Sequence, residues 1–290
     1  MTEGSRGVGI TRFAARGTTR LSYEDRGPLE GPVAVLLHDL LADRSHLRPL
    51  AETLDDAGWR VLMLDARGHG ASAALGTRPY PPTELAADVL TVMDHAVVTR
   101  AHLIGDGWGG SIAIGVSRMA VPRVASMVLI QPDLPGVLAS DDDPRARWAW
   151  QVARDRLSTA GTAATKGLTD RAIGMVLEAR RGADWETALE HGDRTAIRRN
   201  APCLAAILTG AIGNEPSGDV LSALAVSTLV ISGTSASESD QLVAQRLIEM
   251  LPEASAMMAD TSVEHPLPSP NRPPVMSAII GFLSDRISAN

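Results

Sequence analysis

Residues 105–110, Gly-Asp-Gly-Trp-Gly-Gly, are the segment whose spacing points most directly to chemistry. They follow a short apolar run at 101–104 and precede a helical pattern of small residues, the strand–turn–helix context in which a G-x-S-x-G turn exposes a nucleophile. Strand and helix pass too close for side chains two positions before and two after the nucleophile, and Gly105 and Gly109 fill those positions. Gly107 therefore stands at the apex, where it has no side chain with which to attack a substrate.

A shifted register would make Asp106 the nucleophile instead. That shift would place Ile104 and Trp108 at the two crowded positions, where the indole ring would clash. We therefore expect Asp106 to precede the apex and Trp108 to follow it, with the indole forming one wall of a pocket. The covalent chemistry that usually belongs to such a turn is absent from this one.

Composition limits the classes of protein and partner. The 290 residues are 44% hydrophobic, enough for one large α/β domain with a sizeable core. The net charge of −7 offers no cluster of positive charge, so we expect neither nucleic acid nor an anionic membrane as a partner. No apolar run is long enough to span a membrane and residues 1–9 do not resemble a signal peptide, so we predict a soluble cytoplasmic protein. The abundance of Ala and Arg is typical of a GC-rich bacterial genome.

Metal and thiol chemistry are not expected. Cys203 is the single cysteine and lies in an apolar setting typical of a buried residue. The acidic run at 141–143 fits a solvated loop and a helix N-terminus better than a metal site. The histidines outside the motif turns and position 265 show no ligand-like spacing, so we predict no metal and no other cofactor.

The elements that must position the turn alternate between strands and helices, which predicts a mostly parallel, doubly wound sheet. An opening hairpin and five further apolar runs are expected as strands, and four patterns with helical spacing as the helices between and after them. The expected strands are 12–15, 19–24, 33–37, 61–64, 127–130, 228–232 and 255–258, beside 101–104. The expected helices are 46–57, a segment from Thr83 (as N-cap) through Met93, 239–251 and 274–287.

Residues 137–216 break this alternation. They contain no good strand and carry helical patterns at 148–157, 172–180 and 201–212. A helical insertion between two strands predicts a lid over the carboxyl ends of the strands, where ligands bind in open α/β sheets. We predict a core of residues 1–136 and 217–290 with a helical cap of residues 137–216.

Four features in order give the chain its family resemblance. They are His38-Asp39, the run Asp-Ala-Arg-Gly-His-Gly-Ala-Ser at 65–72, the turn at 105–110, and His265, eight residues before Pro273. The sequence resembles the α/β-hydrolase superfamily, in the cap-containing branch that includes esterases, lactonases, epoxide hydrolases and haloalkane dehalogenases. The resemblance implies the α/β-hydrolase fold, with the cap inserted after the sixth strand.

The resemblance also locates the catalytic groups. It implies a nucleophile at the position of Gly107 and a histidine-orienting acid about three residues past Gly233, where Ala236 stands. The implied oxyanion hole consists of the backbone N–H groups of Leu40 and Trp108. Two of the three groups of the usual triad are thus replaced by residues that cannot do their chemistry.

The remaining site residues follow from the same resemblance. His265 is the implied acid–base residue, and Asp133, after the sixth strand, either orients it or caps the loop into the lid. His38, Asp39 and Asp106 are expected around the pocket. Asp39 stands where the family has glycine, so its loop either keeps its backbone shape or brings a carboxylate into the pocket that repels an oxyanion.

Two functions from different classes follow. The first is non-covalent acid–base chemistry with His265 on a small apolar carbonyl-containing molecule, as in a lyase, an isomerase, a cyclase or a hydrolase that activates water. The second is an inactive hydrolase-like protein that binds a small molecule or supports an active homologue. In the first case, replacing His265 with alanine abolishes a turnover; in the second, ligand affinity persists after the same change.

Overall fold

The computed structural model describes residues 9–72, 78–182, 185–188, 191–211, 216, 218–260 and 271–287. Its described strands form one eight-stranded sheet in the order β1-β2-β4-β3-β5-β6-β7-β8. The pairs β1–β2 and β2–β4 are antiparallel, and every other pair is parallel. The strands are β1 Ile10–Arg16, β2 Thr19–Arg26, β3 Val33–Leu37, β4 Arg60–Leu64, β5 Ala101–Asp106, β6 Val124–Ile130, β7 Thr228–Gly233 and β8 Ala254–Ala259. This is the mostly parallel, doubly wound sheet that the sequence predicts.

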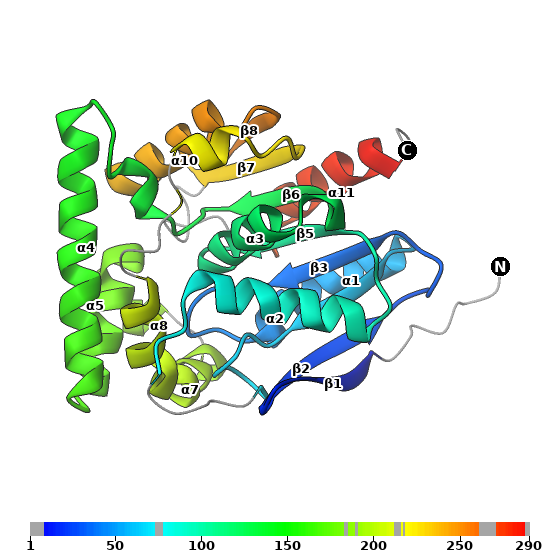
Figure 1. The fold of residues 1–290 in the computed structure, drawn as a ribbon, viewed down its shortest axis with the longest axis horizontal. Helices are drawn as coiled ribbons and strands as arrows, with labels where there is room; N and C mark the ends of the chain where they lie inside the picture. Colours follow the sequence, from blue (N-terminus) through cyan, green and yellow to red (C-terminus); the bar gives the residue numbers. More distant parts are fainter. Residues whose placement is uncertain are drawn as a thin grey trace.

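Helices cover both faces of the sheet (Figure 1). Alternate side chains of the central strands point to opposite faces, so each strand contributes to two apolar clusters. On one face the cluster is completed by α1 (Arg48–Asp56) and α11 (Pro273–Ile287). On the other it is completed by α2 (Pro82–His95), α3 (Trp108–Met119) and α10 (Glu238–Met250). Burial on both faces explains why these strands read as short continuous apolar runs.

Two details of the helices differ from expectation. The helix expected at 46–57 is a 3-10 turn, η1 (Arg44–Leu47), followed by α1. Thr83 is not an N-cap: α2 starts at Pro82 with Pro81 in the capping position and no side-chain cap. Pro82 suits the first helical position because the N–H group of that residue would have no partner within the helix, so the absence of an N–H group in proline costs no hydrogen bond.

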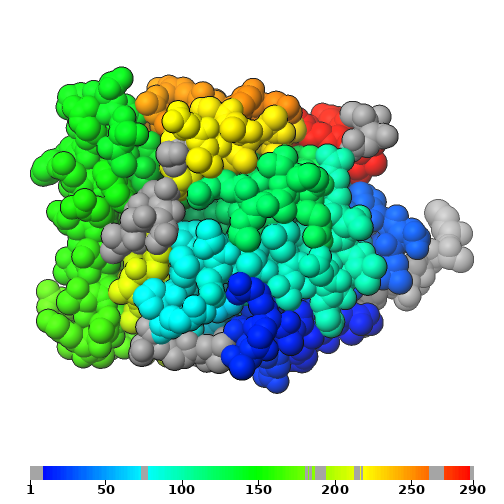
Figure 2. All heavy atoms as spheres, viewed as in Figure 1, coloured from blue at the N-terminus to red at the C-terminus, as the bar shows by residue number. Residues whose placement is uncertain are grey.

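Between β6 and β7 the described chain is helical. The elements in this interval are η3 Pro135–Leu138, α4 Pro144–Thr165, α5 Thr169–Arg181, α6 Trp185–Ala188, α7 His191–Asn200, η4 Ala201–Cys203, α8 Leu204–Ala211 and α9 Gly218–Ser222, of which η3 and η4 are 3-10 turns. Another 3-10 turn, η2 (Val121–Arg123), directly precedes β6. Figure 1 places α4, α5 and α8 at one end of the sheet, and the space-filling view shows α4 as a long ridge along that end (Figure 2).

Small residues let α4 approach its neighbours closely. Ala146, Ala153 and Ala160 lie on its buried face. A Cβ added at Gly161 would lie 3.4 Å from the Cβ of Leu208 in α8, so the two helices pack closely at this position. No helix within the described ranges is long and apolar enough to cross a membrane.

Candidate functional site

The turn after β5 has the backbone of a strained strand-to-helix connection. Gly107 adopts φ 53° and ψ −114°, a region that residues with a side chain rarely occupy. Its N–H donates to the carbonyl of Ile130 at 2.9 Å, and its own carbonyl accepts from the N–H of Asp133 at 3.0 Å. These two bonds fix the apex of the turn to the end of β6 and the loop after it.

The crowding expected around the apex is present. A Cβ at Gly105 would lie 2.5 Å from the carbonyl carbon of Gly109, and a Cβ at Gly109 would lie 2.1 Å from the carbonyl oxygen of Leu37. Neither position accepts a side chain without movement of the backbone. Gly107 lies midway between these two crowded positions.

Asp106 lies at the end of β5, where its carboxylate Oδ2 is 3.3 Å from Nε2 of His46 in η1. The sequence does not predict this pair, because the two residues are 60 positions apart and His46 follows β3, whereas Asp106 ends β5. Asp106 is not among the residues that line the large cavity described below.

The carboxylate of Asp39 occupies the two backbone donors at the foot of this turn. Its Oδ1 accepts a hydrogen bond from the N–H of Leu40 at 2.8 Å and another from the N–H of Trp108 at 2.9 Å. Asp39 is only 5% exposed. Of the two outcomes left open by the sequence, the loop keeps a shape that brings both N–H groups together, with the carboxylate bound to them. Asp39 itself is not among the residues that line the cavity described below, although Leu40 and Trp108 are.

Both histidines of the motif turns hold backbone groups. His38 Nδ1 bonds the carbonyl of Asp39 at 2.8 Å, and its Nε2 accepts the N–H of Ala66 at 3.0 Å. His69 likewise uses Nδ1 on the carbonyl of Arg67 and Nε2 on the N–H of Leu41, each at 3.2 Å. In both rings one nitrogen faces a carbonyl and the other an N–H, which fits the neutral form.

Burial keeps His69 neutral. Loss of hydration and, secondarily, the neighbouring His38 lower the pKa of His69 to about 3. A ring that stays neutral and uses both nitrogens on the backbone is a structural element of the turn.

The turn after β4 is organised by Asp65. Its Oδ1 accepts from the backbone N–H of Arg44, and its Oδ2 from the Arg44 guanidinium at 2.6 Å and the N–H of Ala71 at 2.9 Å. Its own carbonyl accepts from the hydroxyl of Ser72. One buried carboxylate therefore closes the turn and joins it to η1.

Asn200 joins this turn to the helical insertion. Its Oδ1 accepts from the N–H of Gly70 at 3.0 Å, while its Nδ2 donates to the carbonyls of Leu41 and Ala42. The side chain is 1% exposed, and sequence reasoning missed it. The signal available was weak: a lone Asn directly before the helical pattern at 201–212, 130 residues from its partner.

The turns after β6 and β7 differ in their polar groups. Ala236 is buried, so the position where the resemblance expects an acid has no carboxylate. Gln131, 2% exposed with φ 40°, accepts from the N–H of Gly233 through Oε1 at 3.0 Å. Its Nε2 is buried and has no hydrogen-bond partner among the described residues. His265 lies outside the described residues, so the expected pairing with Asp133 stays a prediction.

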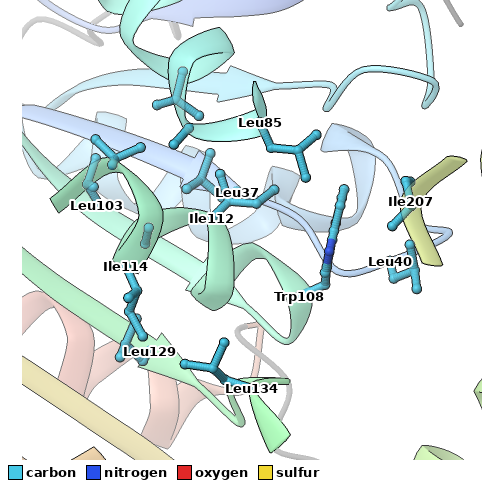
Figure 3. Close-up of a cluster of buried hydrophobic side chains, with 14 of the residues drawn as sticks. Leu37, Leu40, Leu85, Leu103, Trp108, Ile112, Ile114, Leu129, Leu134 and Ile207 are labelled. Carbon is cyan, nitrogen blue, oxygen red and sulfur yellow. The ribbon is translucent and has the colours of Figure 1, made fainter. Parts of the chain in front are cut away.

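A cavity with about 880 Å³ of empty space, part of it open to solvent, lies between the carboxyl ends of the strands and helices α4 and α8. Leu40 and Trp108, whose N–H groups hold Asp39, both line it, and Figure 3 shows their side chains on the side facing Ile207 of α8. The lining is mostly apolar, with Ser111, Arg118 and Asp133 among its polar members. The other lining residues are Tyr80, Pro82, Leu85, Ile112, Ile114, Gly115, Leu134, Pro135, Gly136, Trp150, Leu157, Leu208, Ala211 and Pro216.

No group of three or more potential metal ligands occurs within the described ranges. Cys203 is buried, its thiol donates to the carbonyl of Asn200 at 2.9 Å, and burial raises its pKa to about 12. A thiol with so high a pKa is a poor nucleophile, as expected for a residue that only fills space.

Comparisons with known proteins agree with this architecture. The chain is 34% identical over 110 residues to a Variovorax paradoxus protein named as carbamate hydrolase RutD, covering 38% of this chain and 41% of that one. It is 36% identical over 104 residues to the magnesium-chelatase 30 kDa subunit of Rhodobacter capsulatus, covering 36% of each. These matches span about two fifths or less of the relatives' own length.

Solved structures match over nearly the whole chain. An esterase from Thermogutta terrifontis aligns with a TM-score of 0.73 at 22% identity, covering 97% of this chain and 99% of that one. The enol-lactonase from Burkholderia xenovorans aligns with a TM-score of 0.68 at 22% identity, covering 94% and 100%. The sequence model of the alpha/beta hydrolase fold matches residues 32–254. The chain belongs to the α/β-hydrolase fold family.

Proposed function

We propose that this protein binds a small, largely apolar organic molecule in the cavity beneath α4 and α8, and that it forms no covalent intermediate with it. The observation that carries the proposal is the strained turn after β5 with Gly107 at its apex. The backbone geometry that a nucleophile would need is retained, but the residue there has no side chain.

The cavity supports a ligand of this class. A pocket lined mainly by apolar and aromatic side chains with a few polar groups is the usual form of a small-molecule site. Because α4 and α8 supply part of its wall, we propose that residues 137–216 act as a cap on a core of residues 1–136 and 217–290. Binding then requires the cap to open or the mouth near Arg118 to admit the ligand.

Two losses argue against hydrolysis through an acyl-enzyme. Removal of a serine nucleophile lowers kcat by about 10⁶-fold, and only about 10³–10⁴-fold over water remains from the rest of a site. Here the apex is Gly107, and buried Ala236 supplies no carboxylate to orient a histidine. We therefore do not assign acyl-enzyme hydrolysis to this chain on the strength of the hydrolase names of its relatives.

The proposal is tested with a short-chain p-nitrophenyl ester and with 1-octanol as an apolar probe. The wild type should release no nitrophenol above the buffer rate and should bind octanol in isothermal titration calorimetry. Ala211→Trp places a large ring in the cavity and should abolish octanol binding, whereas Ala223→Trp, at an exposed alanine outside the lining, should leave it unchanged. Turnover by the wild type with an acyl adduct visible in mass spectrometry would contradict the proposal.

Acid–base chemistry is the second candidate, because Asp133 is a carboxylate residue on the cavity wall. Paired with His265, it would exchange protons beside a ligand carbonyl. Deuterium exchange at C1 and C3 of 2-octanone, followed by NMR, tests this directly. A wild-type rate about 10²–10⁴-fold above buffer, lost in both Asp133→Asn and His265→Ala, would establish the chemistry. A rate equal to buffer leaves binding as the function.

A further inference from the structure

The geometry points to Asp39 as an internal occupant of the two N–H groups, those of Leu40 and Trp108, that would otherwise bind an anion. The cavity should therefore select ligands whose polar end is a neutral or positively charged hydrogen-bond donor, such as an alcohol or an amine. It should reject carboxylates. This inference rests on the proposed function and adds the chemical class of the ligand. It is carried by the contacts of a single carboxylate oxygen.

The two donors converge as they would on a bound anion. The N–H groups of Leu40 and Trp108 come from different turns, after β3 and at the start of α3, and both reach Asp39 Oδ1 within 2.9 Å. Paired backbone donors of this kind stabilise a negative oxygen, and the N-terminus of the twelve-residue helix α3 adds to that preference. In this protein the negative oxygen belongs to the chain.

The Asp39 loop is held in place by neighbouring bonds. The carbonyl of Asp39 accepts from Nδ1 of His38 at 2.8 Å and from the N–H of Ala42 at 3.1 Å. Nε2 of His38 in turn accepts from the N–H of Ala66 in the turn after β4. The backbone of Asp39 is thus fixed and the residue is only 5% exposed, so its carboxylate belongs to the interior and not to the surface.

The consequence for a ligand follows from charge. Leu40 and Trp108 line the cavity, so a ligand carboxylate that approached them would meet donors already in use and a buried negative charge beside them. Asp133 is an acidic residue of the lining itself, and the cationic lining residue Arg118 is exposed. Like charges a few ångströms apart in a partly desolvated site lower affinity by about 10²-fold or more.

The test uses two probes of one chain length, octanoate and 1-octanol, titrated by calorimetry at pH 8 into the wild type, Asp39→Gly and Asp39→Asn. The wild type should bind octanol at least about 10²-fold more tightly than octanoate. Asp39→Gly frees both N–H groups and should raise octanoate affinity by about 10²-fold or more, so that the preference for octanol over octanoate falls by at least that factor. Asp39→Asn keeps a side-chain oxygen on the donors without the charge, so it should recover at most about tenfold.

The outcomes separate the two proposals. If no variant binds either probe, the proposed function fails. If octanol binds but octanoate binds the wild type and Asp39→Gly equally, the binding function stands and the role of Asp39 is overturned. If Asp39→Asn gains as much octanoate affinity as Asp39→Gly, occupation of the donors is overturned. Thermal unfolding of each variant, with midpoints within a few degrees of the wild type, establishes that all three are folded.

Discussion

The carboxyl edge of the sheet has two halves, and these differ in how their buried polar side chains are hydrogen-bonded. The early half comprises the turns after β3, β4 and β5, at residues 38–41, 65–72 and 106–108. The late half comprises the turns after β6 and β7, at residues 131–133 and 233–237. In the early half buried carboxylates, imidazoles and an amide are tied to backbone groups. In the late half a buried amide nitrogen has no partner among the described residues, and alanine stands where an acid is expected.

The difference separates what builds the fold from what does its chemistry. The early half supplies the connections that let three strands end at one place, so its polar groups contribute to folding whether or not a reaction occurs there. A side chain that orients a histidine need not support a turn, so alanine at position 236 is compatible with an intact fold. The hydrolase fold persists here because its architectural residues and its reactive residues are largely different ones.

The largest loss of stability is expected at Gly109, where the early half has no space for a side chain. Gly109→Ala places a Cβ 2.1 Å from the carbonyl oxygen of Leu37, and only backbone movement relieves that contact. We expect more than about 4 kcal/mol of lost stability, or no soluble folded protein. Gly281→Ala in α11 meets no atom within 4 Å and should stabilise by about 0.5–1 kcal/mol. Urea unfolding of both variants checks this, and a normally stable Gly109→Ala would contradict the close approach.

Removal of the Asp65 carboxylate should cause the next largest loss of stability. Asp65→Ala leaves the Arg44 guanidinium and the N–H of Ala71 without their buried acceptor. Breaking such a pair costs about 3–5 kcal/mol. The matched control is Asp142→Ala, at an exposed aspartate, which should change the unfolding free energy by less than about 0.5 kcal/mol. Equal effects in the two variants would show that the early half does not depend on its buried charge.

The sequence predicts the glycine turn of the early half better than the hydrogen bonds around it, for a physical reason. Close backbone approach demands glycine at fixed spacing, so Gly105, Gly107 and Gly109 place the turn without knowledge of the fold. Hydrogen bonds between distant residues leave no such trace. Asn200 reaches across 130 residues to Gly70, and the sequence alone does not decide that the Asp39 side chain turns toward the N–H of Trp108.

Acid should lower the free energy of unfolding in a defined range of pH, through His69 in the early half. Because the pKa of buried His69 is about 3 in the folded protein and that of an unfolded histidine is about 6.5, the unfolded state binds the extra proton between these values. Its contribution to stability is complete above pH 6.5 and falls by about 1.4 kcal/mol per pH unit below it. Between pH 7 and pH 5, His69→Gln should therefore lose about 2 kcal/mol less unfolding free energy than the wild type. An identical loss in both proteins would mean that His69 titrates normally.

The smallest effect is expected in the late half, at Gln131. Gln131→Met removes the acceptor of the Gly233 N–H, which leaves a buried donor unpaired at a cost of about 1–3 kcal/mol. It also removes Nε2, a buried donor with no hydrogen-bond partner within the described ranges, which already costs a similar amount in the wild type. The two terms offset each other, so the unfolding free energy should change by less than about 1 kcal/mol. A loss as large as that of Asp65→Ala would mean that Nε2 has a partner in the folded protein, and the late half would then be as fully bonded as the early one.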